Sequence, residues 1–143
     1  GWGRVGPVGS GHYTKMVHNG IEYGLMQAYA EGFSILKHKE EFGLDLAQVG
    51  EIWRYGSVVR SWLLELCTDA LSKNPEMKGI APYVVDSGEG RWTVDAALEL
   101  NVSAPVITLS LMERFRSRDD DSFTDKLLAS MRNEFGGHAI KKE

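Results

Sequence analysis

The sequence predicts an all-α fold, in which one long N-terminal helix packs with about five shorter helices. Residues 10–38 carry an uninterrupted helical pattern, and shorter helical segments with clear start and stop signals follow it. Strand signals are weak, because residues 83–85, Tyr-Val-Val, form the only candidate strand. We therefore expect helices throughout, with the long one as the centre of the fold.

Two helices are expected directly after the long one. Gly43 and Asp45 mark a turn, and residues 44–53 predict a short second helix. Residues 58–72 predict a third, because their apolar side chains recur at helical spacing. Asn74-Pro75 ends this helix, since proline disfavours helical geometry in the residue before it.

A glycine-rich segment separates these helices from the next ones. The segment DSGEGRWT, residues 86–93, predicts a loop, and Thr93 is expected to cap a short helix that runs to Leu100. Ser103-Ala104-Pro105 predicts the start of another helix, which continues to about Phe115.

The C-terminal segment predicts one more helix after a charged loop. The run RSRDDD, residues 116–121, is typical of a solvated loop. Ser122 or Asp121 is expected to cap the last helix. Gly136-Gly137 then ends it, because glycine favours the left-handed conformation that terminates helices.

Length and composition indicate one globular domain without a nucleic-acid or membrane partner. The 143 residues are 43% hydrophobic and 25% charged, with a net charge of -4, so the chain lacks the basic surface that nucleic-acid binding needs. No apolar run reaches the roughly 18 residues of a membrane span, and no signal peptide is recognisable. The single cysteine, Cys67, lies in an apolar run and is interpreted as an inert core thiol in a reducing, cytoplasmic compartment.

One face of the long helix gathers titratable and hydrogen-bonding side chains. At about 100° per residue, with Lys15 set at 0°, Asn19 lies at about 40° and His18 at about 300°. Glu22 lies at about 340°, and Tyr23, at about 80°, is at the margin of this face. A lysine and a glutamate on one face are also typical of an ordinary solvated surface, but that explanation does not account for the uncharged Asn19 and Tyr23. The pattern favours a functional face.

The opposite face of this helix is built of small residues. Gly20, Gly24, Ala28 and Gly32 recur at every fourth position. An interior glycine costs about 1 kcal/mol of helix stability relative to alanine, so a further reason for the glycines is expected. The spacing predicts that another helix or a second subunit approaches this face closely.

We expect no metal site in this chain. His18 and Glu22 are four residues apart, but no third ligand stands at a recognisable spacing and the motif HExxH is absent. The histidines are therefore interpreted as hydrogen-bonding groups.

Four blocks of the sequence resemble one known family. GHYTKMVHNGIEYG, residues 11–24, resembles the signature helix of the 6-phosphogluconate dehydrogenase family. The spacing of Gly6, Gly9, Gly11, Lys15 and Asn19 is similar to the motif shared by the wider β-hydroxyacid dehydrogenases. Three further segments of this chain resemble blocks of the same family in the same order: WRYGSVVRS at 53–61, DSGEGRWT at 86–93 and RNEFGGH at 132–138. The length suits the short type of these enzymes.

The resemblance implies that residues 1–143 are a C-terminal substrate-binding and dimerisation domain with the family's helical fold. The family binds its dinucleotide on an N-terminal Rossmann domain, and no GxGxxG motif after a strand exists in this chain. We expect the chain alone to be inactive, and NAD or NADP, with NAD favoured, to be bound mainly by the absent domain. The implied reaction converts 6-phosphogluconate to ribulose 5-phosphate and carbon dioxide, in the pentose phosphate pathway and gluconate utilization.

The resemblance assigns catalytic roles on the long helix. Lys15 would be the general base for the C3 hydroxyl of the substrate, which requires that the amine lose its proton. Glu22 would be the acid that protonates the enediol carbon after decarboxylation, which requires that the carboxyl hold a proton. His18 and Asn19 would bind hydroxyl or carboxylate oxygens of the substrate.

The resemblance also implies a phosphate site that two subunits share. Tyr23 and Arg60 match family phosphate contacts, and Arg132 and His138 match residues of the C-terminal tail, which in the family completes the neighbouring subunit's site. A homodimer is therefore expected. The loop departs from the long-type pattern, because Ser87 and Glu89, with Arg91 just beyond, stand near the positions of a phosphate-binding lysine and threonine. A glutamate beside a phosphate is unfavourable unless it turns away.

Two other functions are compatible with the sequence. A related β-hydroxyacid dehydrogenase acting on an unphosphorylated acid would share Lys15 and Asn19, but it would not explain Tyr23, Arg60 and the 132–138 tail together. A non-catalytic helical dimerisation module would explain a chain that lacks a cofactor domain. A coding region upstream with GxGxxG after a strand would exclude this module.

Overall fold

A computed structural model describes residues 1–142, and its regular elements are all helices, which confirms the all-α prediction. The described residues form one long helix, five shorter α-helices and a single 3-10 turn. These elements are α1 (Ser10–His38), η1 (Glu40–Phe42), α2 (Leu46–Gly56), α3 (Trp62–Lys73), α4 (Glu89–Glu99), α5 (Pro105–Arg116) and α6 (Phe123–Gly136).

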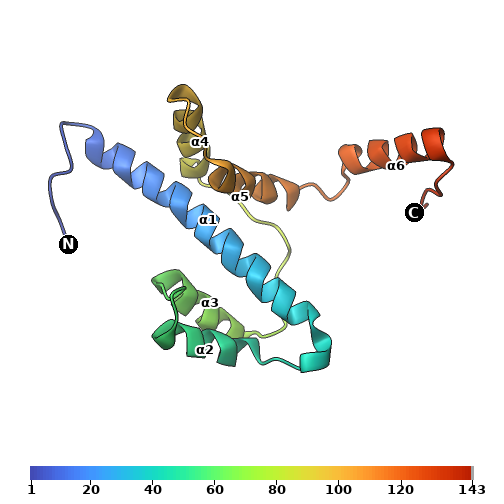
Figure 1. Ribbon diagram of the computed structural model, residues 1–143, viewed down its shortest axis with the longest axis horizontal. Coiled ribbons are helices and arrows are strands. Elements are labelled where there is room, and N and C mark those ends of the chain that lie inside the picture. The colour runs from blue at the N-terminus through green and yellow to red at the C-terminus, as the bar shows by residue number, and fades with distance from the viewer. Residues whose placement is uncertain (143) are drawn as a thin grey trace.

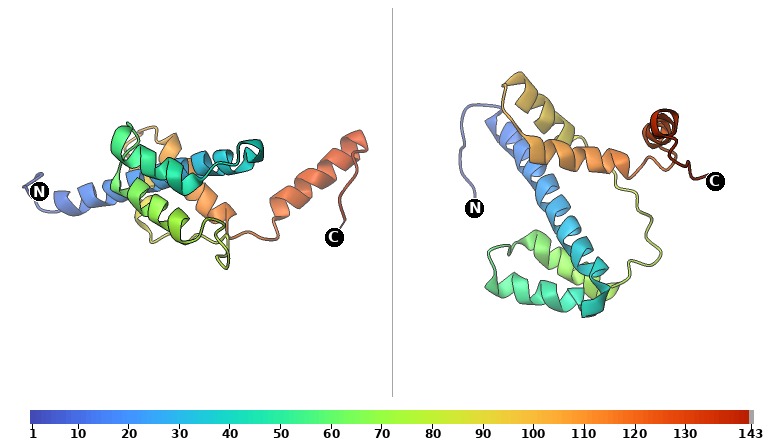
Figure 2. Two further views of the ribbon diagram at one scale, coloured as in Figure 1. Left: turned by 90° about the horizontal axis from the view of Figure 1, so that it is seen from below. Right: turned by 45° about the vertical axis from the view of Figure 1, so that its right-hand side comes forward.

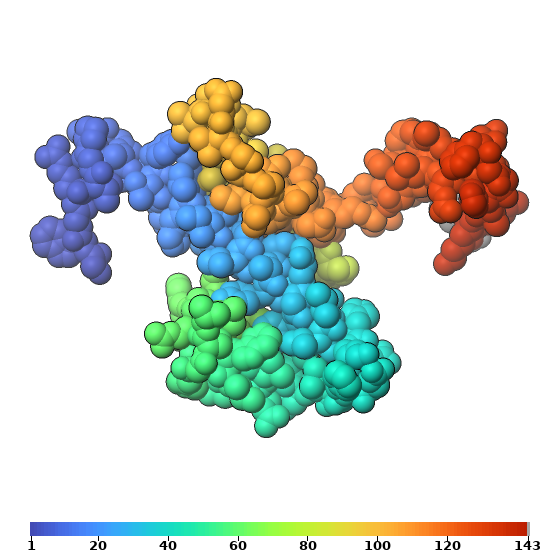
Figure 3. All heavy atoms as spheres, in the orientation of Figure 1, coloured from blue at the N-terminus to red at the C-terminus, as the bar shows by residue number. Residues whose placement is uncertain are grey.

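Helix α1 is the axis of the molecule, and two helix pairs pack against it at different levels (Figure 1). The pair α4 and α5 lies against its N-terminal half, and the pair α2 and α3 lies against its C-terminal half. Helix α6 stands apart from the other helices in every view (Figure 2). The space-filling view shows the N-terminal arm and α6 projecting from opposite sides of the body (Figure 3).

The core at the C-terminal half of α1 is small and apolar. Phe33, Leu64 and Leu71 form a buried cluster, and the ring of Phe33 lies 5.6 Å from that of Trp53. Cys67 packs against this cluster and is half-buried, and its burial raises the pKa of the thiol. A raised pKa keeps the thiol protonated, in agreement with the inert thiol that the sequence predicts.

The contact between α1 and α4 depends on glycines. A Cβ atom on Gly20 would lie 2.6 Å from the side chain of Thr93, and one on Gly90 would lie 2.4 Å from the ring of Tyr23. The Thr93 hydroxyl lies 3.0 Å from the carbonyl oxygen of Met16 and 2.8 Å from that of Glu89, so one proton serves both acceptors. The close approach predicted for the small-residue face is thus confirmed at Gly20, where the neighbour is α4.

Two helices in the first half begin later than the sequence predicts. Asp45 caps α2 by accepting a hydrogen bond from the backbone N–H of Gln48, so this helix starts at Leu46 and continues to Gly56. Helix α3 starts at Trp62 rather than at residue 58, because Ser61 caps it. Residues 57–60 instead form a turn.

The prediction that Thr93 caps α4 is wrong. This helix begins at Glu89, after Gly88, whose φ of 103° favours glycine. Thr93 is therefore inside the helix. It is buried against α1, and its hydroxyl donates to the backbone of that helix. Residues 89–93 of the expected loop are accordingly helical.

The weak strand candidate at residues 83–85 forms no strand in the described chain, in agreement with the expectation of helices throughout. The backbone N–H of Val84 donates to the Ser117 hydroxyl, and the Val85 carbonyl accepts from Arg114, so α5 takes the hydrogen bonds that a neighbouring strand would take. The start of α5 at Pro105 agrees with the prediction.

The prediction for the last helix is confirmed. Ser122 caps α6 by accepting from the backbone N–H of Asp125, and Gly137, with φ 63°, ends it. The preceding charged run is less solvated than expected, because Arg118 forms an ion pair with Asp86.

The glycine contact predicts opposite effects for two alanine substitutions in α1. Gly20→Ala forces its methyl group into Thr93 and should lower the free energy of unfolding by about 1–3 kcal/mol, despite the better helix propensity of alanine. Gly32→Ala adds a methyl group where no atom lies within 4 Å and should leave stability equal or raise it by up to about 1 kcal/mol. Urea unfolding of both variants measures the difference, and equal stability of the two would contradict the packing described.

Candidate functional site

The polar face of α1 lies beside the start of α4, and we call the polar side chains at this contact the site network. Its members are Lys15, His18, Asn19, Ser87 and Glu89. Lys15 Nζ donates to Asn19 Oδ1, and His18 Nδ1 lies 3.0 Å from the same oxygen. Because this amide oxygen can only accept, the Nδ1 atom carries the proton in this arrangement. The structure thus brings together three of the predicted site residues.

Glu89 closes the network from the α4 side. The Ser87 hydroxyl donates to Glu89 Oε2 over 2.5 Å, and this hydrogen bond is the largest cause that lowers the pKa of the Glu89 carboxyl. The backbone N–H of Glu89, the charge of Lys15 and the side chain of Asn19 lower this pKa further. Glu89 is therefore an ionised carboxylate that faces the predicted catalytic residues.

Tyr23 lies next to the network but is enclosed. Its side chain is only 4% exposed, its ring packs against Gly90, and the Arg114 guanidinium lies 3.5 Å from the ring centroid. The hydroxyl oxygen accepts the backbone N–H of Ser87 over 3.1 Å. The hydroxyl still has its own proton to donate to a ligand at the 86–88 loop.

Glu22 and Lys15 lack the surroundings that their predicted roles require. Lys15 is exposed and Glu22 is half-buried. Among residues 1–142, no hydrogen bond or ion pair engages the Glu22 side chain. A basic lysine and an acidic carboxyl both need removal from water, so other chain segments have to cover this face for the predicted chemistry.

A buried carboxylate fixes the loop that carries Ser87. The Asp86 side chain is 4% exposed and accepts two hydrogen bonds from Arg91, at 2.6 and 3.1 Å, while Arg118 lies 3.0 Å away. Both guanidinium groups lie over the ring of Phe115, at 4.4 and 5.0 Å from its centroid. The hydrogen bond from Arg91 is the largest cause that lowers the pKa of Asp86.

This cluster, which we call the Asp86 anchor, was missed in the sequence. Its members are far apart in the chain, and an aspartate before a glycine-rich segment together with an arginine in a charged run is a common pattern. The anchor joins the 86–88 loop to the residues that follow α5, and therefore positions the loop beside Tyr23.

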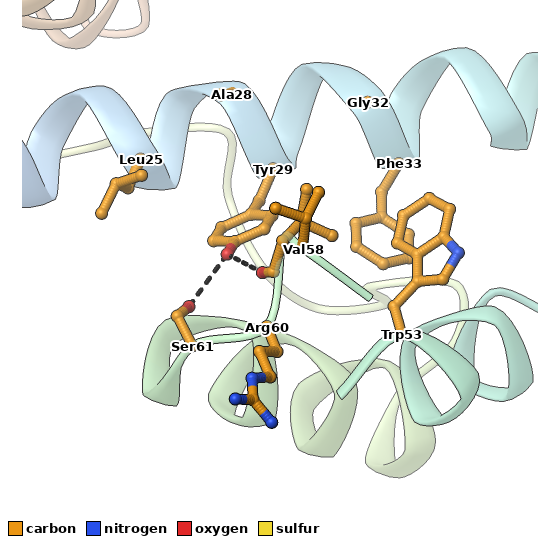
Figure 4. Close-up of a pocket in the computed structure, with 10 residues that line it drawn as sticks. Leu25, Ala28, Tyr29, Gly32, Phe33, Trp53, Val58, Arg60 and Ser61 are labelled. Atoms are coloured by element: carbon orange, nitrogen blue, oxygen red, sulfur yellow. Dashed lines mark hydrogen bonds between the residues drawn. The ribbon is translucent and has the colours of Figure 1, made fainter. Parts of the chain in front are cut away.

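Arg60 lies away from the network. Its neighbours Val59 and Ser61 contact the hydroxyl of Tyr29, at 2.5 and 2.9 Å, and its guanidinium points away from α1 (Figure 4). Tyr29 is 14 residues beyond Lys15 in the same helix, which is about 21 Å along its axis. Within this chain Arg60 and Lys15 therefore do not share a site.

Arg132 and His138 lie on and just after α6. The His138 ring packs against Phe135, and the Asn133 side chain donates to its carbonyl oxygen. Because α6 projects away from α1, these residues reach no part of the network within one chain (Figure 1). They stay predictions that require a second copy of the chain.

Two further properties concern the described residues 1–142. No three His, Cys, Asp or Glu side chains in this part of the chain gather where they could hold a metal ion. None of its helices has the length and apolarity needed to cross a membrane. The candidate site therefore consists of the network, Tyr23 and the loop held by the Asp86 anchor.

Comparisons with known proteins connect this chain to dehydrogenases. Residues 11–142 match the family described as "6-phosphogluconate dehydrogenase, C-terminal domain". YqeC of Bacillus subtilis, provisionally named a 6-phosphogluconate dehydrogenase, is 50% identical over 139 residues, which are 97% of this chain and 46% of that protein. The NAD(+)-dependent, decarboxylating 6-phosphogluconate dehydrogenase of Haloferax volcanii is 46% identical over 144 residues, which are 100% of this chain and 48% of that enzyme. The chain thus spans about half the length of these relatives.

The Asp86 anchor predicts a stability that depends on pH. Because the pKa of Asp86 is lowered in the folded state, its contribution is present above the unfolded value of about 4 and is lost as the pH falls through the lower folded value. Asp86→Asn should lower the free energy of unfolding at pH 7 by about 1–2 kcal/mol, and this difference from the unsubstituted protein should shrink below pH 4.

Asp120→Asn is the matched control, because Asp120 is an exposed aspartate in the charged run 116–121, which also contains Arg118 of the anchor. It should change stability by less than about 0.5 kcal/mol at either pH. Urea unfolding at a series of pH values measures both variants. An Asp86→Asn effect that stays constant with pH would contradict the anchor.

Proposed function

Because the chain belongs to the family of the 6-phosphogluconate dehydrogenase C-terminal domain, we propose that it supplies the substrate-binding half of a decarboxylating 6-phosphogluconate dehydrogenase. The reaction takes 6-phosphogluconate to ribulose 5-phosphate and carbon dioxide, and it belongs to the pentose phosphate pathway and gluconate utilization in the cytoplasm. The observation that carries the proposal is the bonded trio Lys15, His18 and Asn19, which stands on the helix that matches the family.

Lys15 acts as the base in this proposal. It takes the proton of the substrate's C3 hydroxyl while the C3 hydride leaves, and it then returns a proton to the ketone oxygen as the carboxylate departs. Asn19 lies within hydrogen-bonding reach of Lys15 and fixes the direction of its amine. His18 shares the Asn19 oxygen and presents its other ring nitrogen to a substrate oxygen.

Glu22 completes the reaction. When carbon dioxide leaves, the electron pair of the broken C–C bond stays on the substrate and forms the enediol. Glu22 then donates a proton to the carbon that carried the carboxylate. Glu22 lies two turns after Lys15 on the same face of α1, so the base and the acid reach different carbons of one bound sugar acid.

A nicotinamide cofactor accepts the hydride when it is bound by another domain. The described residues contain no strand and therefore no βαβ unit of the kind that holds a dinucleotide, so this chain does not by itself fit the cofactor. NAD is favoured, because the Haloferax volcanii relative, similar over the whole chain, is named as NAD(+)-dependent. A Bacillus subtilis relative, 41% identical over 122 residues, is named as NADP(+)-dependent.

The domain is proposed to act as a homodimer. One chain exposes 11127 Å² of surface, whereas a compact monomer of this size exposes about 7,400 Å². The excess, about 3,700 Å² per chain, is more than enough for an obligate dimer interface, which buries about 1,000–2,500 Å² of each partner. Helix α6 supports this, because five large apolar side chains are exposed on an isolated helix that is too short to be stable alone in water. These side chains are Phe123, Leu127, Leu128, Met131 and Phe135.

The dimer explains the distant arginines. In the proposal, Arg132 and His138 of each chain reach the partner's site, where Tyr23 contributes to binding the substrate phosphate. Arg60, which lies away from the network within its own chain, joins this phosphate site through the assembled dimer. Arginine suits this task because its planar group donates two parallel hydrogen bonds to phosphate. The same contact would cover Lys15 and Glu22, which are too open within one chain.

The base role of Lys15 predicts the effect of one substitution in the full-length protein. Lys15→Met should lower turnover of 6-phosphogluconate by about 10²- to 10⁴-fold, because no other group takes the hydroxyl proton. The matched control is Lys37→Met on the same helix, which removes only an exposed ion pair with Glu76 and should keep turnover within about twofold. Cofactor reduction and size-exclusion chromatography measure activity and assembly. Near-normal activity of Lys15→Met would contradict the mechanism.

The shared site predicts complementation between two inactive variants. Lys15→Met chains mixed with Arg132→Ala chains should recover part of the activity, because one site of each hybrid dimer contains both an intact Lys15 and an intact Arg132. Subunit exchange is followed independently with differently tagged chains. Hybrid dimers that form without activity would argue against a tail acting across subunits.

A further inference from the structure

Glu89 belongs to the site network but has no role in the proposed mechanism. It is the first residue of α4, directly after Gly88. One turn later, Thr93 is fixed against Met16 and Gly20 of α1. The start of α4 therefore has a fixed position on α1, next to the polar face.

The groups around Glu89 are those expected to bind substrate. Its carboxylate accepts from the Ser87 hydroxyl over 2.5 Å, and the backbone N–H of Ser87 donates to the Tyr23 hydroxyl of α1 over 3.1 Å. Asn19 and Lys15 lie near enough to lower the pKa of this carboxylate further. The proposed function assigns the C3 hydroxyl of the substrate to Lys15, and the family resemblance assigns a substrate oxygen to Asn19. A donor hydrogen that serves the Glu89 carboxylate does not serve a substrate oxygen at the same time.

The carboxylate is held loosely enough to leave. No ion pair within 4.0 Å joins Glu89 to a cation in the described part of the chain, and its closest partner, Ser87, is two residues away. An exposed pair of this kind contributes little to stability, so turning the side chain into water costs little. An anionic group that enters the same place gains the hydrogen-bond donors that Glu89 releases, but the Glu89 carboxylate repels it until this side chain turns away.

We propose that Glu89 is a specificity-determining residue whose carboxylate occupies, in the free protein, the place beside Lys15, Asn19 and Ser87 that an anionic group of the substrate takes over. The proposal rests on the proposed function for the identity of the substrate. It also explains how a glutamate is accommodated in a phosphate-binding site, because the side chain is displaced rather than kept beside the ligand.

Removal of the charge should strengthen binding of anions. In the full-length protein, Glu89→Gln should lower the KM for 6-phosphogluconate by about threefold to fivefold, the range of one exposed charge pair, while kcat stays within about twofold. The dissociation constant of inorganic phosphate, measured by calorimetry, should fall by a similar factor. Glu99→Gln, at the other end of α4 and exposed, is the matched control and should change neither value.

Each result decides the proposal. A KM or a phosphate dissociation constant that is unchanged or raised in Glu89→Gln would overturn it, and a raised KM would instead make Glu89 an acceptor for a substrate hydroxyl. If Glu89→Gln loses its helical circular dichroism, Glu89→Thr removes the same charge and takes its place. If the unsubstituted protein does not turn over 6-phosphogluconate, the proposed function fails, and phosphate calorimetry still tests Glu89.

Discussion

The close packing of α4 on α1 is the constraint on which the rest of the site depends. Gly20 and Gly90 let the two helices approach until Thr93 bonds to the backbone of α1 and the Tyr23 ring lies against α4. This contact puts Ser87 and Glu89 beside Lys15 and Asn19 although about 70 residues separate them in the chain. The helix propensity lost at the glycines is the cost of a site assembled from two distant segments.

The second constraint is that one chain leaves its site incomplete. The face of α1 that carries the proposed catalytic residues is open, Arg60 lies near Tyr29, and α6 carries Arg132 away from the body. The single chain also has a large exposed surface, and the exposed apolar side chains of α6 are typical of a surface that a partner buries. In the proposed function, a second copy and a cofactor domain would together supply the covering that the chemistry requires.

Much of the fold follows from local signals in the sequence, whereas the site follows only in part. The length of α1, the cap at Ser122 and the end at Gly137 depend on neighbouring residues, and the periodicity of α1 places Lys15, His18 and Asn19 on one face. The early start of α4, the burial of Thr93 and the Asp86 anchor depend on contacts between distant residues. No local pattern distinguishes a threonine that caps a helix from one that packs inside it against a glycine, so these features required the structure.

The measurement that tests this account most directly uses the full-length protein with NAD or NADP. Reduced cofactor and carbon dioxide are followed together with 6-phosphogluconate, with gluconate and with a small β-hydroxy acid as substrates. The account predicts that both products form in equal amounts from 6-phosphogluconate alone, because the phosphate end of the site selects the phosphorylated acid. Turnover of an unphosphorylated acid in its place would contradict the phosphate roles of Tyr23, Arg60 and Arg132, and would leave only Lys15 and its network as the chemical site.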